Sequence, residues 1–448
     1  MFNSYTKDIL KISWPIIVGQ LGIVLTGFFD NLMVAKLGHV ELAAAGICNS
    51  IYFLLSIFPM GVTMAYATIV GLLQGKNRIN SSHLLVKDSF KTTVLLSIIT
   101  IIVLLVAVQY FHIFQQPEDV NVLSKPYLTL LTCSLTPMLL FFFAKNICDG
   151  FEYTQGGMIV TIIALLLNIF LNWIFIYGNL GSDAYGLNGA GYATIISRTF
   201  SAIALVLLLF YSSNTPIKWT TLKASLKNKK WFSFNGQILK LGIPTGLQYF
   251  FEIAAFAFAA IMAGWLGSKE LAAHQLAITL ASLTYMFASG ISVGSSINVA
   301  KSAGNKNYEK VKLYGINGHR MSVVGMTFFA IVFWIFNREL ASMFSSDIEV
   351  ITMGSQLLIL AAIFQLGDGV QAVSVGLLRG LEDVNKPSII TFMVYWFAAV
   401  PVGYYLSQTL KANAFYSGVN GIWIGLTAGL TLSAIILTAR FYILLRNK

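Results

Sequence analysis

Three carboxylates stand inside long apolar segments of the chain: Asp30, Glu252 and Asp368. In the segment from Leu241 to Leu266, Glu252 is the one ionisable residue, and at 1.5 Å per helical residue the segment is about 39 Å long, enough to cross a bilayer. Glu252 lies near its middle, where a carboxylate costs about 3 kcal/mol or more. Because a bare anion is unstable in a low dielectric, each such group attracts a proton, Na⁺ or an organic cation. We therefore expect cation binding at these carboxylates.

Amide and hydroxyl side chains accompany these carboxylates at helical spacing, and residues three or four apart share one helix face. The candidate ion-coupling and substrate-binding set therefore adds Gln248 and Tyr249 before Glu252, Gln365 and Gln371 around Asp368, and Asn168 with Asn172 four residues later. We place the two asparagines with Asp30 because all three lie in the first half of the chain. Amides also bond between membrane helices for purely structural reasons, and a single buried carboxylate can do the same, so that alternative stays open.

The elements that must position these residues are membrane-spanning helices. Of the 448 residues 56% are hydrophobic and only 10% are charged, too few charges to cover a soluble protein of this size. The fold class is therefore all-α integral membrane. Apolar runs between charged breaks predict twelve spans, at 12–37, 44–73, 90–112, 126–148, 157–178, 189–212, 241–266, 272–300, 315–337, 351–378, 388–409 and 420–445.

The second half of the chain repeats the first. An offset of 229 positions aligns Pro15 with Pro244 and the segment 41–44 with 270–273, an offset of 230 aligns Gly150 with Gly380, and an offset of 232 aligns Gly186 with Gly418. An ordered series with two small insertions indicates a duplication. We expect an N-lobe at 1–212 (spans one to six), a basic cytoplasmic linker at 213–237 and a C-lobe at 238–448 (spans seven to twelve), the two six-helix repeats being parallel in the membrane.

Basic residues indicate the orientation. The side that carries both termini holds 23 of the 29 Lys and Arg residues, and the opposite side holds five. This bias predicts that both termini are cytoplasmic. It also explains the net charge of +11 without a nucleic-acid partner, since the lysines would face anionic membrane lipid.

Enzyme and cofactor chemistry find no support in the sequence. The patterns HExxH, GxSxG and GxxxxGK[ST] are absent, and the five histidines pair with no intramembrane acid at ligand spacing. The three cysteines follow no metal-binding or disulfide pattern. We expect no enzymatic activity and no cofactor, and an ion gradient as the energy source.

At four stretches the chain resembles the multidrug and toxic compound extrusion (MATE) transporters, in particular their NorM-like branch. These are GFFDNLMVAKLG around Asp30, GIPTGLQYFFE ending at Glu252, ELAAHQLAI after it, and LGDGVQAVSVGLLRG around Asp368. The resemblance implies two six-helix lobes forming a V, a monomer in the bacterial inner membrane, and alternating-access export of cationic or amphipathic organic compounds against inward Na⁺ or H⁺.

The same resemblance assigns ion or substrate binding to Asp30, Asn168, Glu252 and Asp368. Na⁺ could bind at Glu252, Asp368 or Asp30. The chain departs from the family pattern at Asn172, where some relatives have an acid, and at Phe364, where some have a tyrosine. The coupling ion, Na⁺ or H⁺, therefore stays open.

Two other functions fit the sequence less well. A lipid-linked saccharide flippase of the same broad superfamily would line its cavity with cationic residues to hold pyrophosphate, and only Arg198 qualifies as such a residue. We interpret Arg198 as a snorkelling or lobe-packing residue. A channel or sensory protein would need a continuous pore or an appended soluble domain, and the sequence indicates neither.

Overall fold

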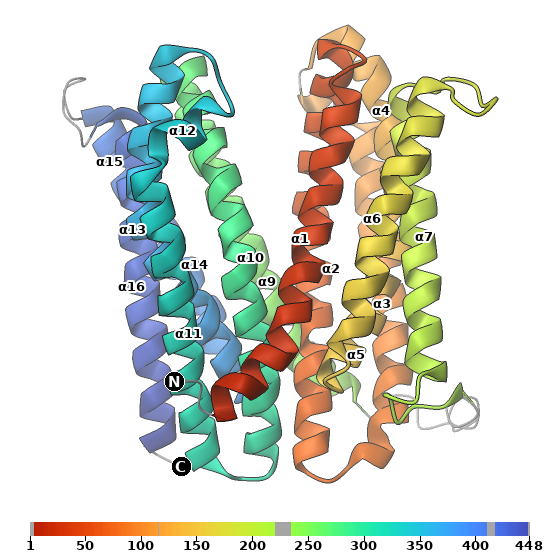
Figure 1. Ribbon diagram of the computed structural model, residues 1–448, viewed down its shortest axis with the longest axis vertical. Coiled ribbons are helices and arrows are strands. Elements are labelled where there is room, and N and C mark those ends of the chain that lie inside the picture. The colour runs from red at the N-terminus through yellow and green to blue at the C-terminus, as the bar shows by residue number, and fades with distance from the viewer. Residues whose placement is uncertain (1–3, 115, 220–233, 410–416, 447–448) are drawn as a thin grey trace. The chain divides into compact units, whose positions relative to one another are not determined.

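The computed structural model describes residues 4–114, 116–219, 234–409 and 417–446, and within these ranges the regular structure is entirely helical (Figure 1). Twelve helical segments of the described residues are long and apolar enough to cross a membrane. The first six are α1 (Ser4–Val34), α2 (His39–Gly75), α3 (Ser82–Gln109), α4 (Glu118–Cys133) with α5 (Leu135–Gly150), α6 (Thr154–Tyr177) and α7 (Leu187–Tyr211). The second six are α9 (Asn235–Leu266), α10 (Ser268–Gly304), α11 (Tyr308–Ile335), α13 (Ile348–Gly380), α14 (Asn385–Val394) with α15 (Val400–Thr409), and α16 (Gly418–Arg446).

Each predicted span overlaps one of these segments, and most helices are longer than predicted. The short α12 (Asn337–Ser342) follows α11. The helix α11 begins at Tyr308, seven residues before its predicted span, and includes Lys310 and Lys312 in its first turns. Charged residues mark where the membrane ends, but a helix continues into water as long as its backbone bonds are satisfied. The boundary predicted from charge is therefore too short at this end of α11.

The duplication is visible in the backbone. Residues with positive φ recur in pairs at the three offsets found in the sequence. The pairs are Asn77 (φ 53°) with Lys306 (56°), Glu152 (66°) with Glu382 (62°), and Gly186 (53°) with Gly418 (61°). Non-glycine residues adopt this conformation rarely. Pairs of such residues that recur at the same offsets as the sequence repeat are therefore not expected by chance. The chain consists of two copies of one six-helix unit.

Two repeated glycines begin the second helix of each copy. Gly38 and Gly267 have φ values of 156° and 157°, and a Cβ on either would collide with the carboxylate of Glu41 or Glu270. Each carboxylate belongs to the first turn of its helix, where negative charge is favoured by the helix dipole. The repeated Leu-Gly-x-x-Glu pattern is therefore explained by local helix initiation.

The contacts divide the chain into two compact units, Val18–Gly246 and Met1–Ile17 with Leu247–Lys448. Both boundaries fall inside a first helix, α1 or α9, and Ile17 and Gly246 are equivalent at the offset of 229. The start of each first helix therefore packs with the other half of the sequence. Thr6 Oγ1 donates to Asn317 Oδ1 at 3.0 Å, and Thr92 Oγ1 donates to Asn235 Oδ1 at 3.2 Å.

These units differ from the predicted lobes 1–212 and 238–448 in two short segments, the start of α1 and the start of α9. Of the predicted linker 213–237, residues 220–233 lie outside the described residues. Residues 235–237 already belong to α9, so the linker would end earlier than predicted.

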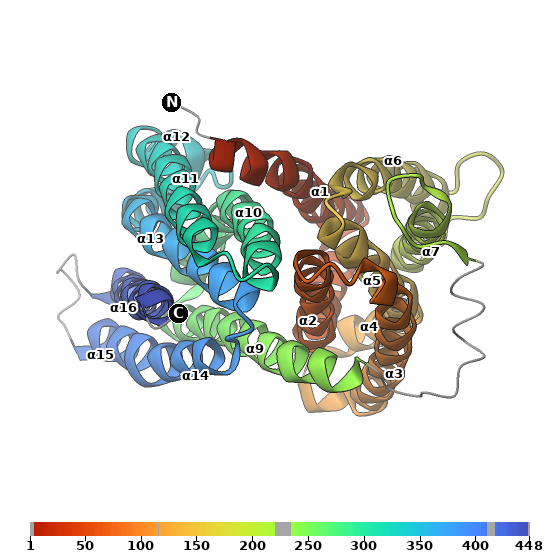
Figure 2. The same cartoon turned by 90° about the horizontal axis from the view of Figure 1, so that it is seen from below.

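The helix α13 is central to the second half, since it packs against α10, α11 and α16 (Figure 2). A Cβ on Gly376 or Gly380 of α13 would collide with backbone atoms of Ser292 or Ser296 on α10. Small residues four apart let membrane helices approach this closely. Close packing matters there because the hydrophobic effect does not drive helix association within lipid. The close contact fixes the position of Gln365, Asp368 and Gln371, which α13 carries.

A buried ion pair lies within α5 of the first unit. Lys145 Nζ lies 2.6 Å from Asp149 Oδ2, one turn later in α5, and both side chains are buried. Removing one partner of such a pair costs about 3–5 kcal/mol, whereas replacing both by apolar side chains is often neutral. We expect Asp149→Leu to lower the melting temperature of the purified protein markedly, and Lys145→Met/Asp149→Leu to restore most of it. Equal melting temperatures for the single variant and the parent would contradict this.

Candidate functional site

The first group of candidate residues lies in the unit Val18–Gly246. Asn172 Nδ2 donates to Asp30 Oδ1 at 2.6 Å and lies 3.3 Å from Asn168 Oδ1. Asn168 Nδ2 lies 3.5 Å from Ser197 Oγ. Both asparagines are fully buried on α6, and Asp30 on α1 is half-buried. The structure thus brings together the three polar residues that the sequence assigned to the first half.

A cavity of about 390 Å³ opens beside this group. It is lined by α1, α2, α4, α5, α6 and α7, and its walls are mainly aromatic and aliphatic. Its polar and charged lining residues are Thr26, Asp30, Asn31, Asn49, Tyr52, Ser56, Tyr127, Thr161, Thr194, Ser197, Arg198 and Ser201. The volume falls in the range of small-molecule sites, and one carboxylate in apolar walls suits an amphipathic ligand.

The structure corrects the interpretation of Arg198. Its Nη1 donates to Tyr52 Oη and to Ser134 Oγ, both at 2.6 Å, and its guanidinium lies 5.0 Å from the centre of the Tyr52 ring. It lines the cavity within one unit rather than snorkelling to a membrane surface or packing between lobes. Two hydroxyl acceptors and an aromatic face make this position tolerable for a guanidinium.

The second group lies in the unit that contains Leu247–Lys448. Gln371 Nε2 donates to Glu252 Oε1 at 3.2 Å, and the hydroxyl of Tyr395 lies 3.4 Å from the same oxygen. Gln371 and Tyr395 also bond to each other, at 3.2 and 3.3 Å. The three side chains come from α9, α13 and the start of the π-helical turn Tyr395–Ala399, and all are buried. They form one closed hydrogen-bonded triangle.

Tyr395 is the functional candidate that sequence reasoning missed. It begins the π-helical turn between α14 and α15, which follow one another along one line (Figure 2). The backbone N–H of Val400 bonds to the carbonyl of Tyr395, and Pro401 follows directly. Since proline lacks an N–H and its ring clashes with the carbonyl four residues earlier, it favours such a local widening. Pro401 was the available signal, although it does not indicate which side chain points inward.

The remaining candidates of this unit lie around the triangle. Asp368 is 5% exposed and lies one turn before Gln371 on α13. Gln365 is fully buried, and among the described residues neither of its amide atoms has a hydrogen-bond partner. Gln248 is buried, whereas Tyr249 is half-buried and its hydroxyl lies 3.3 Å from Arg379 Nη2.

Phe364 is one of the two positions where the chain departs from the family pattern. Its ring is buried and packs against Phe256 and Trp423. It supplies no hydroxyl to the acids. Tyr395 provides that group from another helix, in contact with Glu252.

Neutral groups bond to two of the three carboxylates, Asp30 and Glu252. Within the described ranges, Asp30 and Glu252 each accept hydrogen bonds on one oxygen, from amides or a hydroxyl, and Asp368 makes none. None of the three is in an ion pair among these residues. The same residues contain no group of three or more His, Cys, Asp and Glu side chains able to hold a metal ion.

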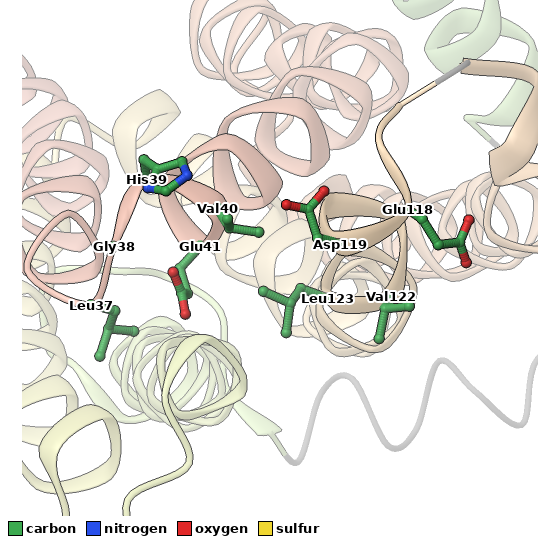
Figure 3. A pocket seen from close by; sticks show the side chains of 9 residues that line it. All are labelled: Leu37, Gly38, His39, Val40, Glu41, Glu118, Asp119, Val122 and Leu123. Atoms are coloured by element: carbon green, nitrogen blue, oxygen red, sulfur yellow. The ribbon is translucent and has the colours of Figure 1, made fainter.

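A second pocket, of about 610 Å³, lies where α1 turns into α2 and α4 begins (Figure 3). Its lining is Leu37, Gly38, His39, Val40, Glu41, Glu118, Asp119, Val122 and Leu123. Glu41, Glu118 and Asp119 all belong to first turns of helices, where acidic residues are expected. None of the predicted site residues lines this pocket.

Twelve apolar helices in two copies, with buried carboxylates within them, are typical of a polytopic membrane transporter. The MatE family model matches residues 15–174 and 244–405, once in each copy and with starts separated by the repeat offset. The chain belongs to the MatE family.

Relatives and solved structures agree with this assignment over the whole chain. The chain is 32% identical to the multidrug resistance protein NorM of Aliivibrio fischeri, over 99% of this chain and 96% of the relative. It is 30% identical to the multidrug resistance protein MdtK of Yersinia pseudotuberculosis, over 97% and 94%. Its fold is similar to the crystal structure of the eukaryotic MATE transporter AtDTX14, with a TM-score of 0.87, 18% identity and coverage of 99% and 96%. An outward-facing multidrug resistance MATE transporter gives a TM-score of 0.87 at 20% identity, also over 99% and 96%.

Proposed function

We propose that this chain is a multidrug exporter that moves cationic and amphipathic organic compounds out of the cell while Na⁺ or H⁺ enters. The observation that carries the proposal is the set of carboxylates at Asp30, Glu252 and Asp368 inside apolar spans. Asp30 and Glu252 accept hydrogen bonds from neutral groups, and among the described residues none of the three is in an ion pair. The relatives named multidrug resistance proteins support the substrate class. The flippase alternative is not favoured by these relatives.

Competition for the same negative charge provides the coupling. A carboxylate in a low dielectric is costly as a bare anion, so it is occupied by a proton, by Na⁺ or by the cationic part of a drug, but not by two of these at once. Entry of the ion from outside then displaces the drug, and a drug arriving from inside displaces the ion. Alternating access exposes the site to one side of the membrane at a time.

The driving force is sufficient for export. One positive charge moving down a potential of about 100 mV releases about 2.3 kcal/mol, and each pH unit adds about 1.4 kcal/mol. When one monovalent cationic drug leaves for each ion that enters, the two charges cancel, so the concentration gradient of the ion drives export, and one pH unit supports a drug gradient of about tenfold. The potential contributes when the drug is neutral. Among the candidate residues, Gln248, Tyr249, Gln365 and Gln371 would orient the ion or drug around Glu252 and Asp368, while Asn168 and Asn172 would do so at Asp30.

We further propose that the protein is a monomer in a bacterial inner membrane, with both termini in the cytoplasm. The concentration of lysine and arginine on one side supports this orientation.

The test is transport by the purified protein in liposomes, with a fluorescent organic cation and with Na⁺ and pH gradients imposed separately. We expect at least one inward gradient to drive the dye out of its compartment, with collapse of that gradient by a matching ionophore stopping transport. The gradient that drives transport identifies the coupling ion. Dye movement that responds to neither gradient would contradict ion-coupled export.

A further inference from the structure

A histidine that belongs to none of the groups above lies inside the second unit. His319 is on α11, which packs against α13, and α13 packs against α16 (Figure 1). Its Nε2 lies 2.9 Å from Ser374 Oγ of α13, and the hydroxyl of Tyr442 on α16 lies 3.4 Å from its Nδ1. Ser374 Oγ also lies 2.8 Å from Thr438 Oγ1 of α16. Four side chains from three helices thus form one hydrogen-bonded network.

The network continues a row of polar side chains along α13. Asp368, Gln371 and Ser374 follow one another at intervals of three residues, and all three are buried. Residues three apart are neighbours on a helix surface. Gln371 bonds to Glu252, and Ser374, one turn later, bonds to His319. The row therefore runs from the carboxylates of the second unit to the imidazole.

The row also runs from the middle of the membrane toward the side proposed as cytoplasmic. The span boundary predicted at residue 378 lies about 15 Å from Asp368, about 10 Å from Gln371 and about 6 Å from Ser374 along the helix axis. His319 lies about 6 Å inside the boundary predicted at residue 315 for its own helix. It is half-buried, whereas the three residues of α13 are buried. His319 is thus placed between the cytoplasmic surface and the carboxylates.

Imidazole is suited to pass protons at such a position. It can bind a proton at one nitrogen and release one from the other, and histidines within membrane spans occur in proton relays. The titratable group that faces His319 from α16 is Tyr442, and α13 presents the hydroxyl of Ser374. Among the described residues His319 makes no ion pair. A proton bound to the ring is therefore not retained by a carboxylate partner.

We propose that His319 carries protons from the carboxylates of the second unit to the cytoplasm. When the neutral ring has its proton on Nδ1, Nε2 accepts from the hydroxyl of Ser374. A proton that leaves the carboxyl group of Asp368 or Glu252 reaches Nε2 through water and this hydroxyl, and imidazolium forms. Nδ1 then releases its proton past Tyr442 to cytoplasmic water, and exchange with water returns the remaining proton to Nδ1. The proposal rests on the exporter function proposed above and assigns the proton as its coupling ion.

The test compares two transport modes of His319→Gln in proteoliposomes loaded with a fluorescent organic cation. Glutamine can still bond to Ser374 but cannot take up an additional proton. We expect export driven by a pH gradient to slow at least about tenfold, because a positioned proton-transfer group typically contributes about 10²–10⁴-fold. Exchange of fluorescent for unlabelled dye without any ion gradient should proceed as in the parent, since this mode delivers no proton to the cytoplasm.

Chemical rescue separates a proton carrier from a structural residue. In His319→Ala, added imidazole should restore part of the pH-driven export. Pyrazole, a ring of the same size but a much weaker base, should not. The pH gradient is monitored and matched in both cases, because imidazole crosses membranes and would otherwise dissipate it.

Two variants serve as controls. Thr438→Val removes the hydroxyl that bonds to Ser374 but leaves the imidazole in place, so it tests the structural contribution of the network. His112→Gln removes an exposed imidazole in the turn Phe111–Phe114. Both should retain pH-driven export.

Three outcomes would overturn the proposal. They are unchanged pH-driven export in His319→Gln, equal slowing of export and dye exchange in that variant, and export by the parent that responds to Na⁺ alone. The last would leave the exporter function intact, whereas a parent that responds to neither gradient would contradict that function as well. If neither His319 variant folds, Ser374→Ala decides in the same assay. It removes the hydroxyl that passes the proton and should slow export but not exchange, and equal rates in both modes would overturn the proposal.

Discussion

Replacing Glu252 by glutamine is expected to abolish ion-driven drug exchange while leaving the protein folded. Glutamine matches glutamate in shape, and its oxygen can still accept from Gln371 and Tyr395, which bond to Glu252 Oε1. What disappears is the negative charge that a proton, Na⁺ or an organic cation would neutralise. Efflux of a fluorescent cation from loaded proteoliposomes should fall to the level of protein-free liposomes.

The same substitution, Glu252→Gln, should leave the thermal stability of the protein unchanged or raise it. Glu252 is 7% exposed within an apolar span, and a neutral amide costs less to bury there than a carboxylate. The melting temperature of Glu252→Gln should therefore equal or exceed that of the parent, which separates lost coupling from lost folding.

The matched control for this experiment is Glu349→Gln. Glu349 is an exposed carboxylate in the first turn of α13, where it pairs with Lys269. Surface ion pairs contribute about 1 kcal/mol or less, so this variant should retain exchange. Full exchange activity in Glu252→Gln would refute the role assigned to that carboxylate.

The parts of the site that could be predicted are those where a polar residue interrupts an apolar run. Asp30, Glu252 and Asp368 stand out because burying charge is costly, and Asn172 because it lies one turn from Asn168. The sequence grouped Asn172 with Asp30 only because both lie in the first half of the chain, and the structure shows the amide of Asn172 2.6 Å from Asp30 Oδ1. Likewise, the twelve spans follow from hydropathy alone.

The parts that could not be predicted depend on which helix faces another. Tyr395 occurs in an aromatic stretch of a type common near membrane surfaces, and its contact with Glu252 requires the packing of α9 against the π-helical turn. In the sequence Arg198 is a charge with no evident partner. Spacing along one helix cannot show that Tyr52 and Ser134, on other helices, accept its hydrogen bonds. The sequence also could not predict that the start of α1 packs with the second half and the start of α9 with the first, because the hydropathy of these segments is the same in either arrangement.

Gly61 of α2 is expected to be as sensitive to substitution as the carboxylates. A Cβ on Gly61 of α2 would lie 2.7 Å from the Cα of Gly246 and 3.3 Å from the carbonyl oxygen of Thr245, both on α9. These are backbone atoms, so no side-chain rotation relieves the contact. The equivalent glycine of the second copy, Gly290 of α10, faces the equivalent residue of α1, Ile17, but there a Cβ would first collide with the side chain. Close approach of the second helix to a first helix at this point is therefore a property of both copies.

Gly61→Leu is expected to prevent correct folding. Overpacking a tight contact costs about 1–3 kcal/mol where side chains can move, and more is expected where two helix backbones must separate. The measurement is the yield of monodisperse protein by size-exclusion chromatography of a fluorescent fusion, together with the melting temperature of any folded fraction. Gly46→Leu is the control, since Gly46 lies on the same helix and a Cβ there meets nothing within 4 Å. Normal yield and melting temperature for Gly61→Leu would show that α2 and the start of α9 can part without loss of the fold, and that the contact is incidental rather than required.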